Sequence, residues 1–484
     1  MIADTFLKSI QRSLPFELTT VQREVIVHLS TFIFNPKPMG AYILRGYAGT
    51  GKTTLISAVI KTLRKLGRET VLLAPTGRAA KVLAHHAGMP AFTIHKEIYR
   101  QKKLDDINPT FDIDINKHKN AVFFIDEASM IANDESGTSP FGTGRILEDL
   151  VDYVFGNPGN SIVFIGDNAQ LPPVGEEESP ALSPNALKAM GLEVSGFQMS
   201  TVMRQACESD ILTNATMLRQ HLSANLTDQL PVIKFSGSDE LLKLPGSEIV
   251  DSLENDYAKY GQQEVVVITR SNKQAVQYNL GIRDMIFGRS AGLTVGDIVM
   301  VVRNNYFWPE MIASKIKSNN KNEMPPMNFF ANGDIAIVTY IRQCTDLYDL
   351  HFADVTLCFP DYNDYEADVR VLLDSLTSES PSLTKEQNEK LYRGVLEDYA
   401  EIRNKKERMR KMRLDINYNA VQIKYAYAVT CHKAQGGQWR NVYIDQGWLP
   451  PETTDRSYYR WLYTAMTRAT HSLRLVNWPE KQSS

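Results

Sequence analysis

A glycine-rich segment near the start of the chain carries the clearest chemistry. Gly46-Tyr-Ala-Gly-Thr-Gly51-Lys52-Thr53 matches the pattern G-x-x-x-x-G-K-[ST] without a mismatch. Glycines let backbone N–H groups converge on a phosphate at a helix N-terminus, where the helix dipole also favours an anion. We expect Lys52 to bridge the β- and γ-phosphates of a nucleoside triphosphate and Thr53 to bind Mg²⁺. The residues expected to surround the nucleotide are Gly46, Ala48, Gly49, Thr50, Gly51, Lys52, Thr53 and Thr54.

Two adjacent acids supply the other groups that triphosphate hydrolysis requires. Asp126 and Glu127 follow the apolar run Phe123-Phe-Ile. Asp126 is expected to hold Mg²⁺ through its water shell, and Glu127 to polarise the attacking water. An Asp-Glu pair after a strand is a weak signal alone, because loops are rich in acids. Its combination with the phosphate loop makes it a strong one.

Short apolar runs alternate with helical patterns and predict the sheets that position these groups. Buried parallel strands read as continuous apolar runs, and the intervening segments are long enough for crossover helices. The first set of expected strands is Ala41–Leu44, Thr70–Ala74, Ala121–Ile125 and Ser161–Ile165. The second is Glu264–Thr269, Lys424–Thr430, Val442–Asp445 and Ser472–Val476. Two α/β units in one chain leave a cleft between them, a common place for a ligand.

The segment between the strands at 264–269 and 424–430 has a different character. Val295–Val302 and Asn332–Tyr340 each contain a Gly-Asp turn followed by a β-rich run, which predicts a small β-barrel. A polar helix-forming stretch follows from Thr384 to Arg413 and ends with seven cations against Glu401 and Glu407. This basic end is either a solvated helix face or a surface that contacts a nucleic-acid backbone.

Composition sets broad limits on the class of protein. The 484-residue chain has a formal net charge of −3, which neither favours nor excludes nucleic acid, because only a local basic groove is needed. Its four cysteines are scattered without a CxxC pair, which suits a reducing compartment. No apolar run approaches the ~20 residues of a membrane span. Phe6–Leu14 fits a first helix better than a transit peptide, so we expect a cytoplasmic protein that does not bind a membrane.

Further sequence blocks narrow the family, since a phosphate loop alone indicates only a nucleotide. In order they are Ala74-Pro-Thr-Gly-Arg-Ala-Ala-Lys81, Phe92-Thr-Ile-His95-Lys96, Gly166-Asp-Asn-Ala-Gln170-Leu-Pro-Pro-Val-Gly175, Met203-Arg204-Gln205, Thr430-Cys-His432-Lys433-Ala-Gln435-Gly436 and Tyr463-Thr-Ala-Met-Thr467-Arg468-Ala469. With the two nucleotide motifs they resemble the superfamily 1B helicases, specifically the RecD-like group and its Dda relatives. The resemblance runs from Leu18 to Leu475.

The resemblance implies roles for further residues around ATP and Mg²⁺. Gln22 matches the glutamine that reads the adenine edge, since an amide can donate and accept at once. Gln170 matches the sensor of the γ-phosphate. Arg204 and Arg468 match the two arginines that stabilise charge on the phosphate oxygens in the transition state. The predicted catalytic set is Lys52, Asp126, Glu127, Gln170, Arg204 and Arg468.

The same resemblance places one group of residues along a nucleic-acid strand. They are Thr76, Phe92, His95, Lys96, Thr430, His432 and Lys433. Hydroxyls suit phosphate oxygens, and an aromatic ring can stack on a base. For Phe92 a place in the core is an equal alternative. Residues 99–119 occupy the position of the family's strand-splitting wedge, although no side chain there is singled out as the one at the fork.

The implied fold is α/β, with two RecA-like parallel-sheet P-loop domains, a small wedge insertion and an inserted SH3-like β-barrel. The expected boundaries are 1–98 with 120–245 for the first RecA-like domain and 99–119 for the wedge. The second RecA-like domain is expected at 246–292 with 421–484, and the barrel with its helical insertion at 293–420.

The implied activity is ATP-dependent 5′-to-3′ DNA helicase action in replication, repair or recombination. The expected partners are single-stranded and forked duplex DNA, with single-stranded-DNA-binding or replication proteins, for a chain acting as a monomer. Nothing resembles a nuclease module, so no nuclease activity is expected. The alternatives are an RNA-directed helicase, which ATPase stimulation by DNA and RNA oligomers would distinguish, and an ATP-switched clamp, which would fail to unwind a forked duplex.

Overall fold

The computed structural model describes residues 2–101, 111–133, 142–199, 209–318, 326–327, 329–449 and 455–484. The chain divides into two compact units. The first comprises Met1–Pro231 and Thr454–Thr467, and the second comprises Val232–Thr453 and Arg468–Ser484. Within the described residues, no helix is both long enough and apolar enough to cross a membrane.

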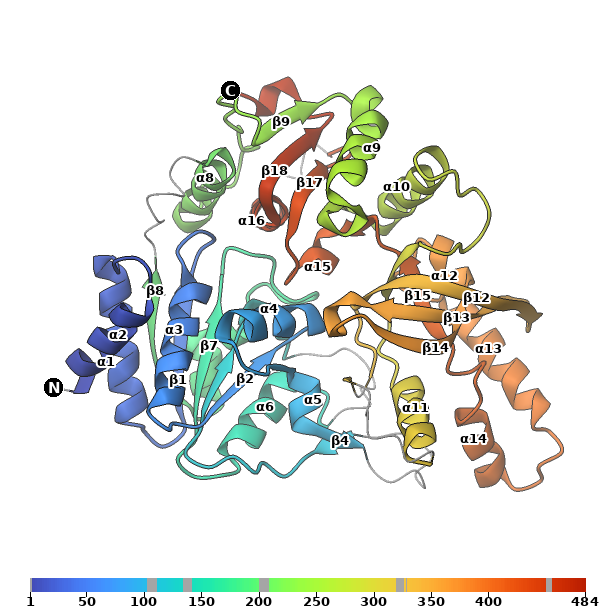
Figure 1. The fold of residues 1–484 in the computed structure, drawn as a ribbon, viewed down its shortest axis with the longest axis horizontal. Helices are drawn as coiled ribbons and strands as arrows, with labels where there is room; N and C mark the ends of the chain where they lie inside the picture. Colours follow the sequence, from blue (N-terminus) through green and yellow to red (C-terminus); the bar gives the residue numbers. More distant parts are fainter. Residues whose placement is uncertain are drawn as a thin grey trace. The chain divides into compact units, whose positions relative to one another are not determined.

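The first unit is built on a six-stranded, entirely parallel sheet in the order β3-β2-β6-β7-β1-β8 (Figure 1). The strands are β1 (Gly40–Gly46), β2 (Thr70–Ala74), β3 (Phe92–Thr93), β6 (Val122–Ile125), β7 (Ser161–Gly166) and β8 (Glu193–Met199). Its helices are α1 (Ile2–Ser13), α2 (Thr20–Phe34), α3 (Lys52–Lys65), α4 (Gly77–Ala87), α5 (Ile94–Ile98), α6 (Ile146–Phe155), α7 (Pro184–Ala189), α8 (Asp210–Ala224) and α16 (Arg456–Met466). A short antiparallel pair, β4 (Tyr99–Gln101) and β5 (Phe111–Ile113), lies outside this sheet.

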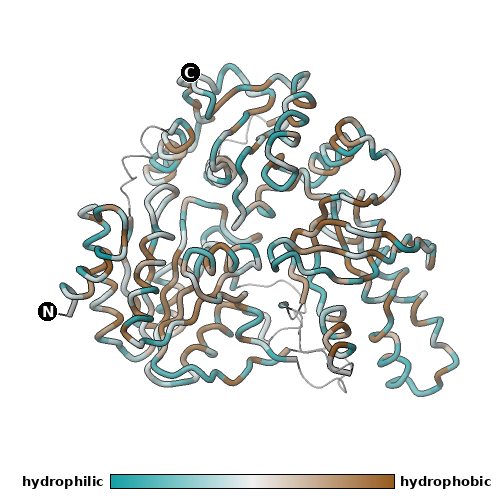
Figure 2. The backbone as a smooth tube through the Cα atoms, viewed as in Figure 1, coloured by the Kyte–Doolittle hydropathy of each residue, from teal (hydrophilic) through white to brown (hydrophobic). Residues whose placement is uncertain are grey.

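Burial explains why four of these strands, β1, β2, β6 and β7, could be predicted from apolar runs, whereas β3 and the largely unburied β8 were not predicted. Every residue of β6 and β7 is buried, as expected for a parallel sheet covered on both faces. One hydrophobic core joins α1, α2 and α3 to the sheet through side chains such as Ile33, Val59 and Phe124. Figure 2 shows hydrophobic residues concentrated along the strands. The core therefore fixes β1, β6 and β7 as rigid supports for the loops at their ends.

The second unit contains a five-stranded parallel sheet in the order β16-β10-β17-β18-β9. Its strands are β9 (Leu241–Leu244), β10 (Val265–Thr269), β16 (Ala428–Thr430), β17 (Trp439–Asp445) and β18 (Ala469–Val476). Helices α9 (Ile249–Tyr260), α10 (Asn272–Met285) and α15 (Cys431–Ala434) accompany it.

A closed five-stranded barrel interrupts this second unit. It is formed by β11 (Ile298–Val301), β12 (Ile335–Leu347), β13 (Leu350–Phe359), β14 (Tyr365–Leu372) and β15 (Val421–Tyr425). Tyr348 and Asp349, at the turn of the β12–β13 hairpin, both have positive φ, the conformation that a tight hairpin turn requires. Helices α11 (Phe307–Ser318), α12 (Asp374–Thr377), α13 (Lys385–Asp398) and α14 (Lys405–Arg413) belong to the same insertion.

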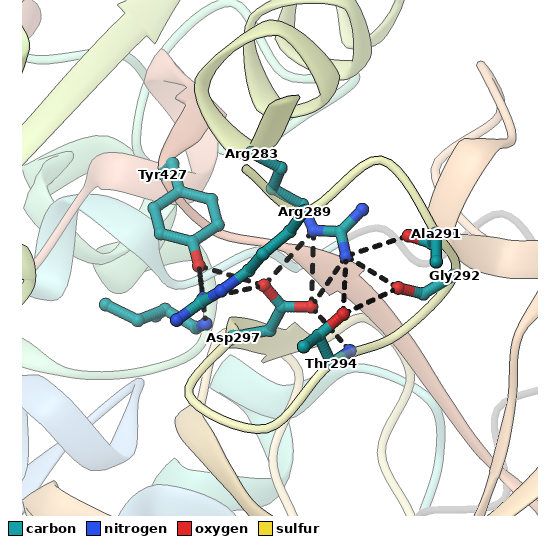
Figure 3. Close-up of polar contacts among 8 residues, drawn as sticks. Arg283, Arg289, Ala291, Gly292, Thr294, Asp297 and Tyr427 are labelled. Carbon is teal, nitrogen blue, oxygen red and sulfur yellow. Dashed lines mark hydrogen bonds and ion pairs between the residues drawn. The ribbon is translucent and has the colours of Figure 1, made fainter. Parts of the chain in front are cut away.

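A buried charge network ties α10 to the start of the barrel (Figure 3). Asp297 is fully buried and pairs with Arg283 at 3.0 Å and with Arg289 at 3.0 Å. The hydroxyl of Tyr427 and the backbone N–H of Thr294 donate to the same carboxylate. Because Asp297 immediately precedes β11 and Arg283 lies on α10, the network joins the barrel to the α/β part of this unit.

The expected architecture of two parallel α/β sheets and a small barrel is confirmed, with two corrections. The single strand expected at Lys424–Thr430 is wrong, because the chain leaves the barrel at the end of β15 and enters the sheet only at β16. The helix expected from Thr384 to Arg413 is two helices, since residues 399–404 separate α13 from α14.

Candidate active site

The phosphate loop joins β1 to α3, and its backbone explains its glycines. Gly49 and Gly51 have φ values of 76° and 79°, a region that L side chains rarely adopt. A Cβ on Gly46 would lie 2.8 Å from the Lys52 side chain. Helix α3 begins at Lys52 without a side-chain cap, which leaves its first-turn N–H groups for an anion.

Lys52 folds back over the loop. Its ammonium donates to the carbonyl oxygen of Tyr47 at 3.0 Å and also to that of Gly46. Thr50 is buried, and its hydroxyl donates to the same Tyr47 carbonyl at 2.8 Å. Thr53 and Thr54 lie in the first turn of α3. The Lys52 ammonium thus lies among the phosphate-loop residues that are expected to surround the phosphates.

The two acids follow β6, which is two strands from β1 in the sheet, with β7 between them. The carboxyl ends of parallel strands meet at one edge, so these acids lie at the edge from which the phosphate loop also emerges. Glu127 has a φ of 49°, a left-handed conformation that costs a non-glycine residue about 1 kcal/mol or more and often marks a functional position.

Asp126 lies in an unusual electrostatic environment. Its pKa is raised to about 7, chiefly by burial and then by the neighbouring Glu127 carboxylate, while the Glu127 N–H and Lys52 oppose the rise. Such a carboxyl gains from a cation close by, which would hold it ionised. Within the described residues no group of three or more His, Cys, Asp or Glu side chains could bind a metal. A hydroxyl from Thr53 and one carboxylate nevertheless fit Mg²⁺, which takes hard oxygen ligands and keeps several waters.

The loop after β7 adds a polar cluster beside the phosphate loop. Tyr463, on α16, donates its hydroxyl to Asp167 at 2.5 Å and accepts the N–H of Ala48 at 2.9 Å. All three residues belong to the first unit. The adjacent Gln170 is 7% exposed, and its amide oxygen is buried without a hydrogen-bond partner among the described residues. A ligand at this edge could supply that partner.

Tyr463 and Asp167 both lie in the sequence blocks that indicate the family, but the sequence predicts no role for either residue. The signal was too weak for that, because the two residues are almost three hundred positions apart and only the fold pairs them. Burial of the hydroxyl and its second bond to the phosphate loop make Tyr463 the structural link between α16, β7 and that loop.

The three remaining predicted nucleotide residues are placed differently. Gln22 is buried at the start of α2, where its amide oxygen accepts the N–H of Thr19 in a capping box. Arg204 lies outside the described residues. Arg468 is buried in the second unit, where its guanidinium donates to the carbonyl of Gly437 at 3.2 Å.

In the first unit, the predicted strand-contacting residues lie at the ends of β2 and β3. The hydroxyl of Thr76 caps α4 by accepting the N–H of Ala79. The Lys96 ammonium lies 4.9 Å from the centre of the Phe92 ring, and both side chains are half-buried, so part of the Phe92 ring remains accessible to solvent. Burial lowers the pKa of His95 to about 4, so its ring is neutral at physiological pH.

In the second unit, the predicted contacts surround the end of β16. Thr430 is the N-cap of α15, but its hydroxyl makes no capping hydrogen bond. Lys433 lines a small cavity with Thr430, Lys424 and Asn272. Burial lowers the pKa of Lys433 to about 8, and neighbouring Lys424 adds to the effect. His432 is exposed on the same turn.

Two protein families match separate parts of this chain. Residues 17–230 match a family described as an AAA domain, and residues 425–476 match the UvrD-like helicase C-terminal domain. The first match spans the phosphate loop, the Asp-Glu pair and Gln170. The second spans Thr430, Lys433 and Arg468.

Individual relatives agree with these matches. The chain is 29% identical to the ATP-dependent RecD2 DNA helicase of Deinococcus radiodurans over 36% of its own length and 21% of that protein's. It is 27% identical to the ATP-dependent DNA helicase dda of Enterobacteria phage T4 over 53% of its own length and 55% of that protein's. The alignments thus span about half or less of these two relatives.

A solved structure of two coordinating Pif1 helicases at forked dsDNA is similar over 97% of this chain and 94% of that one, with a TM-score of 0.43 and 15% identity. The family matches and the two helicase relatives coincide with the ordered motifs and with the geometry around the phosphate loop. On that evidence, the chain combines an AAA domain at residues 17–230 with a UvrD-like helicase C-terminal domain at residues 425–476, and it is similar to the superfamily 1B helicases of the RecD and Dda type.

Proposed function

We propose that this protein moves 5′ to 3′ along single-stranded DNA, driven by ATP hydrolysis, and separates the strands of a duplex ahead of it. The observation that carries the proposal is the convergence of three groups at one sheet edge. These are the open N-terminus of α3, the Asp126–Glu127 pair after β6 and the Gln170 amide oxygen after β7, which has no hydrogen-bond partner among the described residues. The Dda and RecD2 proteins, by their names, act on DNA.

In this proposal each residue at the edge has one task. The first-turn N–H groups of α3 and the Lys52 ammonium bind the β- and γ-phosphates. Thr53 and Asp126 would hold Mg²⁺, which supplies positive charge to the phosphate oxygens when bound. Glu127 accepts a proton from the attacking water, and the Gln170 amide oxygen orients that water beside the γ-phosphate.

In this proposal Arg204 and Arg468 stabilise the negative charge that develops on the phosphate oxygens. Guanidinium suits this task because its planar donors match several oxygens at once. Gln22 would read adenine only by exchanging its present partner, Thr19 N–H, for the base. Mutation of Gln22 should therefore affect both nucleotide choice and the start of α2.

The strand itself would bind through phosphate contacts at Thr76, His432, Lys433 and the free hydroxyl of Thr430. Phe92 and His95 would stack on bases, and the β4–β5 pair would belong to a wedge at the fork. We also propose that the barrel is SH3-like and that the domain boundaries follow those of the family. Partners such as single-stranded-DNA-binding proteins, a monomeric state, a cytoplasmic location and the lack of nuclease activity are part of the same proposal.

Two assays test the proposal. ATP turnover should rise more with single-stranded DNA than with RNA of the same sequence, and equal or greater stimulation by RNA would contradict the assignment to DNA. Partial duplexes with a single 5′ or 3′ tail should separate only from the 5′ tail. Unwinding from the 3′ tail alone would contradict the direction, and turnover without any unwinding would indicate an ATP-driven switch instead.

A further inference from the structure

Helix α14, at the far end of the barrel insertion, carries a concentration of positive charge that the proposed mechanism does not use (Figure 1). Seven cations and one acid lie between Arg403 and Arg413, in a protein whose net charge is −3. Of these cations, Arg403, Lys405, Lys406, Arg410 and Lys411 are exposed. The charge therefore faces solvent and opposes the sign of the chain as a whole.

The helix is firmly built, so its charges are displayed on a fixed surface. Asn404 caps its N-terminus by accepting the N–H groups of Lys406 and Glu407. On its inner face, Met412 is 1% exposed and joins a hydrophobic cluster with Leu391 and Val395 of α13. The cations occupy the remaining faces, on both sides of this anchor.

Neighbouring acids do not neutralise this surface. On α13, Glu386 pairs with Lys390, and Glu389 pairs with Arg393. Asp415, just after α14, accepts the hydroxyl of Tyr399 at 3.0 Å. Within the described residues, six basic side chains form no ion pair with an acid: Arg403, Lys405, Lys406, Arg408, Arg410 and Lys411.

Helix stability accounts for only part of this pattern. Arg410, Lys411 and Arg413 lie in the last turn, where cations complement the helix dipole. Lys405 and Lys406 lie in the first turn, where cations oppose it. Lys406 and Arg410 are also like charges four residues apart, an arrangement that destabilises a helix. A merely solvated helix would gain from fewer cations at these positions.

We propose that α14 is a second nucleic-acid contact, one that binds the phosphate backbone of duplex DNA independently of base sequence. A nine-residue helix is about 13 Å long, the axial rise of about four nucleotides of one strand. Helix α14 itself contains no aromatic residue, and the exposed Tyr392 beside it donates its hydroxyl to Met409, whereas surfaces that bind single strands present a series of rings for stacking. Mixed Arg and Lys side chains on a rigid helix suit a regular row of phosphates.

This inference rests on the proposed function only for the identity of the polymer, and its test does not depend on unwinding. Binding of the full-length protein to a fluorescent blunt duplex and to a single strand of equal length is measured by anisotropy, without nucleotide, over a salt series. The test variant neutralises three exposed cations of α14, Lys406→Gln, Arg410→Gln and Lys411→Gln. The control variant removes the same charge from α13, Lys385→Gln, Lys390→Gln and Arg393→Gln.

The slope of log affinity against log salt is negative, and each lost phosphate contact should reduce its magnitude by about 0.9. For the blunt duplex, the magnitude of this slope should be smaller by about two to three in the α14 variant, which lacks three cations, and unchanged in the control variant. Single-strand binding should change by less than the duplex value in both variants. Circular dichroism and the thermal midpoint verify that both variants are folded.

Several outcomes would overturn the proposal. Unchanged duplex binding by the α14 variant, or an equal loss in the control, would show that α14 makes no specific contact. An equal loss for single strand and duplex would show that α14 does not distinguish the two and would contradict the assignment to duplex DNA. Tighter binding of polyglutamate than of the duplex at equal salt would assign the helix to an acidic protein. If wild-type protein binds duplex as predicted but never unwinds it, the proposed function fails while this inference stands.

Discussion

Replacing Asp297 by asparagine should destabilise the second unit far more than the same change at an exposed ion pair. The carboxylate is 0% exposed and accepts hydrogen bonds from Arg283, Arg289, Tyr427 and the backbone of Thr294 (Figure 3). Asparagine keeps the shape but removes the charge. The Arg283 side chain, 3% exposed, would then be a buried cation without a counter-ion.

Removing one partner of a buried pair costs about 3–5 kcal/mol. Arg283 retains hydrogen bonds to the carbonyls of Ala291 and Gly292, so we expect the lower end, about 3 kcal/mol. Asp368→Asn is the matched control, because the Arg342–Asp368 pair has side chains 42% and 64% exposed. Exposed pairs contribute about 0–1 kcal/mol.

Urea denaturation followed by circular dichroism would measure both variants against the wild type. The free energy of unfolding should fall by about 3 kcal/mol for Asp297→Asn and by less than about 1 kcal/mol for Asp368→Asn. Equal effects would refute the view that the network in Figure 3 joins the barrel to α10 through charge. A stabilised Asp297→Asn protein would refute it more strongly.

Three further predictions concern the first unit. Tyr463→Phe should leave Asp167, which is 1% exposed, without its phenolic hydrogen-bond donor. The free energy of unfolding should fall by about 1–3 kcal/mol, and the KM for ATP should rise. An unchanged KM would show that this contact does not influence the nucleotide site. Burial lowers the pKa of His118, but hydrogen bonds to two glutamates outweigh it and raise the pKa above 6.5. The stabilisation from His118 should therefore be complete below pH 6.5 and disappear as the pH rises through the raised value, and His118→Gln should flatten this part of the urea-midpoint profile. Gly51→Ala should abolish most ATP turnover. The control is Gly67→Ala, because Gly67 has a similar φ of 71° and open space around it, and this variant should lose only stability. Equal turnover in the two variants would contradict the phosphate-loop geometry.

The buried strands could be predicted from sequence because full burial makes their residues uniformly apolar. The expected runs at Thr70–Ala74 and Ser161–Ile165 match β2 and β7 to within a residue. The same signal misled at Lys424–Thr430. Both β15 and β16 are buried, so the apolar run continues through Ala426 and Tyr427, where the chain passes from barrel to sheet.

The barrel's longest hairpin was not anticipated, for a related reason. Its turn residues, Tyr348 and Asp349, adopt positive φ without the glycine or asparagine that usually signals such a turn. The Tyr348 hydroxyl donates to Asp398 of α13, and its ring packs against Phe352, so the contacts of this turn come from residues that a local pattern does not contain.

The nucleotide site could be predicted from sequence where the chemistry requires particular residues at a fixed spacing, as at Gly46–Thr53. It could not be predicted where tertiary structure pairs distant residues. The link from Tyr463 to Asp167 and Ala48 depends on α16 packing beside β7, and a lone tyrosine in the sequence does not indicate it. The capping bonds of Gln22 and Thr76 are local by contrast, and Thr19-Thr-Val-Gln22 fits the S/T-x-x-E/Q pattern of a capping box, so sequence could have indicated that one.

ATP turnover and unwinding of a 5′-tailed duplex, measured together for the wild type and for Lys52→Ala, test the central claim most directly. The wild type should hydrolyse ATP and separate the strands. Lys52→Ala should lose both activities in parallel while remaining folded by circular dichroism, because the ammonium beside the Gly46 and Tyr47 carbonyls is the group assigned to the phosphates. Undiminished turnover in Lys52→Ala would place the chemistry elsewhere and contradict the account.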